Sequence, residues 1–222
     1  MNSIPSSAVA TLALALAVGC SRGPEPCVSA GTCPAGQECL ANRCVVAGGD
    51  PVSADSQRLV LEPIEMAVVE GRGRDPSELP AAITFGSSAT TTATLYLKFP
   101  RAWRDKRRVE AAFVILEPMA ATFGSNDDVS VAVWRVGERW QPAALALAKQ
   151  PALLPPRGRG IARSAPPSPL RIDVTEIVRY LAKNPANDHG IALRASPGES
   201  AGASFATGSA GGRSPRLEIY VR

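Results

Sequence analysis

The sequence predicts an all-β fold, an antiparallel β-sandwich of the jelly-roll type with one short helix, preceded by a small disulfide knot. Three observations support this fold class. From about residue 56 onward, apolar and polar residues alternate with period two, as in half-buried strands. Clusters of Gly, Pro, Ser and Asn interrupt the alternation at the spacing that sandwiches show. Four of the five cysteines are crowded between residues 27 and 44, a segment too short to bury a core.

An apolar run near the N-terminus predicts an export signal. Ala8 to Val18 is too short to cross a bilayer as a helix, and Gly19 and Cys20 follow it directly. The run Leu16-Ala17-Val18-Gly19-Cys20 resembles the lipobox of bacterial lipoproteins. The resemblance implies a lipoprotein signal peptide over residues 1–19, with Cys20 carrying diacylglycerol and palmitate and left N-terminal by cleavage. The alternative is an ordinary signal peptide that leaves Cys20 as a spare thiol.

Lipidation of Cys20 would hold the chain at a membrane. Residues 20–26 then form the tether, and acyl chains that contribute about 0.8 kcal/mol per buried methylene make the attachment permanent. Ser21 stands where an Asp would resemble an inner-membrane retention signal. We therefore expect a location in the bacterial cell envelope, at the outer membrane, on either its periplasmic or its exposed side.

The cysteines of residues 27–44 predict a knot of two disulfides. The pattern Cys-x5-Cys-x5-Cys-x4-Cys is formed by Cys27, Cys33, Cys39 and Cys44. Disulfides suit an oxidising compartment, and their three possible pairings remain open. The paired Cys-x2-Cys spacing typical of zinc sites is absent from the sequence. Cys20 is left over from the pairing, which agrees with its lipidation.

Residues 45–55 are small and lack periodicity, so they predict a linker to a domain over residues 56–222. In that domain the alternation predicts strands at 58–69, 81–85, 94–99, 110–117, 129–136, 170–173, 190–195, 203–207 and 216–221. Residues 111–116 are apolar at every position, which predicts a central strand covered on both faces. The Pro- and Arg-rich stretch from 143 to 169 is expected to be a loop in which Arg157, Arg159 and Arg163 carry no specific role.

One short helix is predicted between the last strands. Asp173 is placed to cap it, and Glu176 stands three residues later at capping-box spacing. Asn184 and Pro185 end it. We expect its apolar face to pack on the sandwich through Ile177, Tyr180 and Leu181.

Several of these elements, in this order, resemble the DNRLRE domain, a jelly-roll-like sandwich related to carbohydrate-binding modules. The matching blocks are Leu95–Phe99, Val109–Leu116, Val131–Trp134 with Trp140, Ile172–Val178, His189–Arg194 and Pro215–Tyr220. The resemblance implies a non-catalytic module, attached in some proteins to polysaccharide-processing enzymes and in others to surface or adhesion proteins. It implies no particular ligand.

Charge and composition argue against nucleic-acid partners and against catalysis. The net charge of +4 is spread along the chain without the aromatic interleaving of nucleic-acid binders. Gly198 to Gly202 match Gly-x-Ser-x-Gly, but the one histidine, His189, lies upstream, contrary to hydrolase order. We expect His189 to be a turn residue before a strand. No acid/base or nucleophile set can be assembled, so we expect no enzyme.

Tryptophans and nearby arginines supply a candidate ligand platform, because an aromatic face covers the apolar side of a sugar ring. The platform candidates are Trp103 and Trp134 with Arg104 and Arg107. Trp103 lies in a basic run that suits an anionic polysaccharide or a phospholipid head group, or that simply forms a solvated connection. Trp134 could face outward or fill the sheet's second side, and Trp140 is expected in the core.

No cofactor is expected, and calcium is the one ion left open. Asn126, Asp127 and Asp128 offer clustered oxygen ligands, to which Asp173 or Asp188 could add another. The same residues also favour a turn between strands.

These observations predict a non-catalytic envelope lipoprotein whose sandwich binds a polysaccharide or a cell-surface protein. The alternative is a structural unit of a surface assembly or adhesive appendage, with the cysteine-rich segment as its stalk. A hydrolase is the third possibility and lacks a catalytic set.

Overall fold

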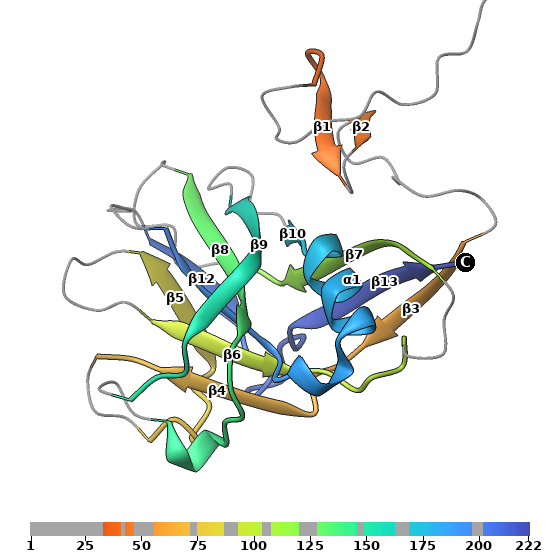
Figure 1. Ribbon diagram of the computed structural model, residues 1–222. Coiled ribbons are helices and arrows are strands. Elements are labelled where there is room, and N and C mark those ends of the chain that lie inside the picture. Colours follow the sequence, from red (N-terminus) through yellow and green to blue (C-terminus); the bar gives the residue numbers. More distant parts are fainter. Residues whose placement is uncertain are drawn as a thin grey trace, which may run out of the picture.

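Two antiparallel sheets, packed face to face, form the body of the protein in the computed structural model (Figure 1). The structure describes residues 33–40, 43–46, 56–71, 75–86, 93–103, 108–119, 128–145, 149–162, 169–196 and 202–222. The predicted fold class, an antiparallel β-sandwich with one α-helix, is confirmed. The proposed signal peptide and tether, residues 1–26, lie outside the described residues.

The four-stranded sheet has the order β10-β7-β13-β3. Its strands are β10 (Leu170–Asp173), β7 (Val109–Leu116), β13 (Arg216–Val221) and β3 (Gln57–Leu61). The five-stranded sheet has the order β4-β6-β11-β8-β9. Its strands are β4 (Glu65–Val69), β6 (Thr94–Lys98), β11 (Ile191–Ala195), β8 (Val129–Val136) and β9 (Leu153–Ala162).

Two strand pairs and two 3-10 turns lie outside the two main sheets in the described part of the chain. β5 (Ala82–Gly86) pairs with β12 (Gly202–Ala206). β1 (Gln37–Leu40) and β2 (Arg43–Val46) form a hairpin. Short 3-10 turns, η2 (Pro142–Ala144) and η3 (Pro185–Asn187), lie in the connections. Among the described residues, no helix has the length and apolar character needed to cross a bilayer.

The core lies between the two sheets and follows the alternation. Leu95, Leu97 and Val133 of the five-stranded sheet are fully buried against Val114 and Ile219 of the four-stranded sheet. Each such side chain contributes about 1.5–3 kcal/mol when removed from water. The alternation therefore orients each strand and leaves its other side chains on the outer face of its sheet.

The helix α1 (Thr175–Lys183) packs on the sandwich, as predicted. Ile177 and Leu181 are buried in the core, and Tyr180 packs against it. Asp173 Oδ1 accepts the backbone N–H of Thr175 at 2.8 Å, although the N-cap residue is Val174. Glu176 pairs with Arg179 at 2.8 Å. The carboxylate of Asp173 thus satisfies the first turn, one residue earlier than a standard N-cap.

Two sequence predictions were wrong in position. Residues 58–69 form two strands instead of one, because Pro63 falls between β3 and β4, and the strands join different sheets. The predicted loop over 143–169 contains β9, which is ten residues long and pairs with β8. Arg157 and Arg159 lie in that strand, and Arg163 lies outside the described residues.

The close approach of β9 to β10 explains its glycines. A Cβ atom at Gly158 would lie 2.2 Å from the carbonyl oxygen of Asp173, and one at Gly160 would lie 2.6 Å from a side-chain carbon of Ile172. Only glycine allows such an approach. The glycines that suggested a loop therefore reflect the tight packing of β9, in the five-stranded sheet, against β10 of the four-stranded sheet.

The predicted disulfide segment is confirmed in part. Cys33 and Cys44 are bonded, with their Cα atoms 5.4 Å apart, and Cys39 is disulfide-bonded as well. Cys20 and Cys27 lie outside the described residues.

Candidate functional site

One half of the outer face of the five-stranded sheet is covered. The Tyr96 ring lies 5.5 Å from the Trp140 ring, and Leu145 packs over both beside η2. Trp140 Nε1 donates to the carbonyl oxygen of His189 at 2.7 Å, and Tyr96 donates to Gln150 at 2.9 Å. Burial raises the pKa of Tyr96 to about 12, and the charge of Arg194 opposes this rise. The prediction that Trp140 packs in a core is confirmed.

The other half of this face is hollow because of the strand register. Trp134 of β8 stands between Ala192 of β11 and Arg157 of β9. In the next row, Ala132 stands between Arg194 and Arg159. The small side chain of Ala132 leaves space that a larger side chain would fill. The resulting hollow has a volume of about 290 Å³ and is lined by Ala132, Trp134, Arg157, Gly158, Arg159, Arg194, Ala195 and Ser196.

Three arginines surround the hollow without acidic partners. The guanidinium carbons of Arg157 and Arg194 lie 5.1 and 5.6 Å from the centre of the Trp134 ring, within cation–π range. Within the described residues, no carboxylate forms an ion pair with Arg157, Arg159 or Arg194. Trp134 Nε1 is buried and has no hydrogen-bond partner there either. The hollow therefore concentrates positive charge and donors.

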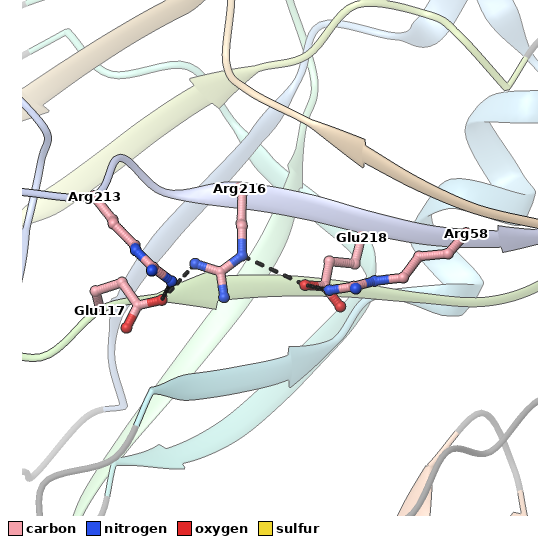
Figure 2. Close-up of polar contacts among 5 residues, drawn as sticks. All are labelled: Arg58, Glu117, Arg213, Arg216 and Glu218. Carbon is pink, nitrogen blue, oxygen red and sulfur yellow. Dashed lines mark hydrogen bonds and ion pairs between the residues drawn. The ribbon is translucent and has the colours of Figure 1, made fainter.

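On the outer face of the four-stranded sheet, a row of arginines forms ion pairs with glutamates. Figure 2 shows a ladder in which Glu117 and Glu218 alternate with arginines. Its members, in order, are Arg213, Glu117, Arg216, Glu218 and Arg58. The arginines of the ladder have carboxylate partners, whereas the arginines around Trp134 have none among the described residues. The contrast marks the hollow as the candidate ligand site.

The glycines of β9 also orient the arginines of the hollow. Arg157 and Arg159 alternate with Gly158 and Gly160, so the arginines point outward while the glycines face β10. These arginines were missed in the sequence because their segment was taken for a loop. The run Arg157-Gly158-Arg159-Gly160 has period two, and that was the available signal.

The other residues of the predicted platform differ in their placement. Trp134 lies in the hollow. Trp103 is only 3% exposed and lines an internal cavity of about 10 Å³ with Val178 and Leu181, so it offers no face to a ligand. Its prediction as a platform was wrong, because the chain after β6 turns this ring into the core. Arg104 and Arg107 lie outside the described residues.

The acidic residues considered for calcium are spread apart or engaged. Asp188 is buried and pairs with Arg101 at 3.0 Å, and Asp173 caps α1. Asp128 is exposed before β8, and Asp127 lies outside the described residues. In the part of the chain that the structure describes, no three His, Cys, Asp or Glu residues gather as a metal site would require. A calcium site stays a prediction without structural support.

Among the remaining sequence candidates, the described residues His189 and Gly202 do not line the hollow. Gly198 to Ala201 are outside the described residues, and Gly202 begins β12. His189 lies in the short connection between η3 and β11, just before the strand. Burial lowers the pKa of His189, the charge of Arg139 lowers it further, and Asp188 opposes both. The histidine is therefore neutral at neutral pH and adds no charge.

A comparison of the chain with models of known protein families found no match, and a comparison with curated proteins found no significant one.

Proposed function

We propose that the protein is a non-catalytic binding protein of the bacterial cell envelope that holds an acidic glycan on the outer face of its five-stranded sheet. The observation that carries the proposal is the hollow in which Arg157, Arg159 and Arg194 surround Trp134 and have no carboxylate partner among the described residues.

The chemistry of the hollow favours an anionic ligand. A guanidinium group presents paired N–H donors that match both oxygens of a carboxylate or a sulfate. Hydrogen bonds to charged groups contribute about 1.5–3 kcal/mol each, more than those to neutral hydroxyls. The Trp134 ring supports two of these groups by cation–π contact and offers apolar surface to a sugar ring. A neutral polysaccharide would leave the arginine charge uncompensated.

The size of the hollow suits part of a polymer. Its volume of about 290 Å³ is at the lower end of the range for ligand pockets. We therefore propose that one or two acidic sugars of a longer chain occupy it, while the rest of the polymer passes over the sheet.

The sequence supports the rest of the proposal. The lipobox-like run ending at Cys20 supports attachment to the outer membrane. The resemblance to the DNRLRE domain supports a module that binds without catalysis.

The test is a binding measurement on the full mature chain without lipid. Polygalacturonate supplies carboxylates, dextran sulfate supplies sulfates and dextran is the neutral control. We expect saturable binding to an acidic polymer, weakened about tenfold or more by Arg157→Ala, Arg159→Ala or Arg194→Ala. Arg213→Ala is the matched control, because it removes the same charge from an 81% exposed side chain in the connection before β13, beside the other sheet, and should leave affinity unchanged.

Two results would overturn the proposal. One is binding of dextran as tight as that of the acidic polymers. The other is equal affinity of the hollow variants and Arg213→Ala, which would reduce binding to nonspecific charge attraction. If none of the polymers binds, a protein partner or a structural role at the cell surface becomes the favoured function.

A further inference from the structure

The outer face of the four-stranded sheet is buried beside the arginine ladder. Ala111, Phe113 and Ile115 point outward from β7, and Tyr220 points outward from β13. Their exposed fractions are 0%, 0%, 5% and 6%. Outward side chains of a two-layer sandwich reach such values only where a third layer lies over them.

Arg171 supplies part of this layer. It projects from the outer side of β10, and its guanidinium carbon lies 3.8 Å from the centre of the Phe113 ring. Its Nε and Nη2 atoms are themselves buried. The side chain that covers Phe113 is therefore covered in turn.

The β1–β2 hairpin supplies another part. Val45 of β2 packs against the cluster of Ala111, Phe113, Ile115 and Tyr220. Val46, the next residue along the strand, points to the opposite face and is 67% exposed, and Cys44 lies on that same opposite face in its bond to Cys33. The hairpin therefore has one side turned toward the sheet and one turned away, as Figure 1 shows it on the β7 and β10 side of the molecule.

We infer that the disulfide-bonded hairpin is a docked third layer on the four-stranded sheet, held there through Val45, and does not hang free as a stalk. Two strands of four residues are marginal by themselves, so the Cys33–Cys44 bond maintains the shape that presents Val45. The two outer faces of a sandwich point in opposite directions. The hairpin is therefore docked on the side away from Trp134. The importance of this placement for ligand access rests on the proposed function.

The docked hairpin and the arginine hollow lie on opposite faces of the sandwich, which bears on how an attached protein is oriented. Cys33, where the described chain begins, is bonded to Cys44 of the hairpin on the covered face, so an attachment through this end of the chain favours an orientation with the arginine hollow turned toward the surroundings. A polymer can then reach Arg157, Arg159 and Arg194 while the protein is held at a surface.

Tyrosine nitration of the full chain tests the docking. The three tyrosines report three places, because Tyr220 lies under the hairpin, Tyr96 is buried on the other sheet and Tyr180 is partly exposed. We expect slow nitration of Tyr220 in the wild type, and an increase of about tenfold in Val45→Asp, which places a charge in the contact. Val46→Asp is the matched control on the opposite side of the same strand and should not change Tyr220.

Tyr96 keeps the test interpretable. If Tyr96 stays protected in Val45→Asp, the sandwich is folded and the change at Tyr220 reports undocking. If Tyr96 is nitrated as well, Cys33→Ser with Cys44→Ser replaces that variant, because it loosens the hairpin without placing a charge on the sheet. Nitration of Tyr220 as fast as that of Tyr180 in the wild type would overturn the inference, as would equal rates in both aspartate variants.

A binding assay separates this inference from the proposed function. Val45→Asp should bind the acidic polymer as the wild type does, since the hollow is on the other sheet. Loss of binding in both proteins, with the expected nitration pattern, would reject the proposed function and keep the docking. Wild-type binding of the polymer together with rapid nitration of Tyr220 would reject the docking and keep the proposed function. The wild type immobilised through its N-terminus should retain its polymer capacity, and loss of that capacity would contradict the orientation.

Discussion

Gly158 lies so close to β10 that a Cβ atom in its place would stand 2.2 Å from the carbonyl oxygen of Asp173. The same strand carries Arg157 and Arg159 on its opposite side. The position of two arginines of the hollow therefore depends on a glycine whose missing side chain would point toward β10.

Replacing this glycine should damage both stability and binding. Gly158→Ala places a methyl group against backbone that cannot turn aside, so β9 must move, at a cost of about 1–3 kcal/mol in unfolding free energy. The displaced arginines should then bind the acidic polymer less tightly. Urea unfolding and polymer titration measure the two effects. Gly137→Ala is the milder control, since its nearest neighbour is the end of the Leu154 side chain at 2.8 Å; equal effects of the two variants would contradict the explanation.

Substitutions of Trp103 and Trp134 should affect different properties, stability for Trp103 and polymer binding for Trp134. Trp103→Ala removes a core side chain and should lower the unfolding free energy by about 3–5 kcal/mol. Trp134→Ala, on the outer face, should cost less stability and weaken polymer binding more. Urea unfolding combined with titration distinguishes them, and a stable Trp103→Ala that has lost binding would restore the platform prediction for Trp103.

Stability should fall at high pH through Tyr96. Its folded pKa is raised to about 12 by burial, above the ordinary value of 10.0. Between these values the unfolded chain releases the phenol proton while the folded chain keeps it, so the contribution is full below pH 10 and is lost as pH rises toward 12. The loss is roughly 2–3 kcal/mol. The unfolding free energy, measured at several pH values across this window, should fall less steeply with pH in Tyr96→Phe, because phenylalanine cannot titrate. The same dependence on pH in the variant and the wild type would exclude Tyr96 as the cause.

The arginine ladder should depend most on its buried carboxylate. The Glu218 side chain is 4% exposed and lies between Arg58 and Arg216. Glu218→Ala leaves those charges without their shared partner and should cost about 2–4 kcal/mol in unfolding free energy. Arg213→Ala at the exposed end should cost less than about 0.5 kcal/mol. Thermal unfolding compares them, and similar losses would show that the ladder acts as a surface network only.

The positions of several strands and of the helix follow from the sequence because burial imposes periodicity. Strand β8 (Val129–Val136) and strand β10 (Leu170–Asp173) lie where the alternation predicted them. The all-apolar run 111–116 is covered on both faces, as predicted. Each of these features needs only the local pattern of side chains, which is why it can be read from the chain alone.

Tertiary structure decided the features that depend on distant neighbours. Strand β9 was hidden because its glycines indicate a loop until β10 lies against them. The exposure of a tryptophan depends on what packs over it, which left Trp103 and Trp134 indistinguishable in sequence. The arginine hollow exists because the registers of β8, β9 and β11 bring Trp134, Arg157 and Arg194 together across the sheet. Local pattern determined which residues face inward; only pairing between strands determined which outward side chains meet.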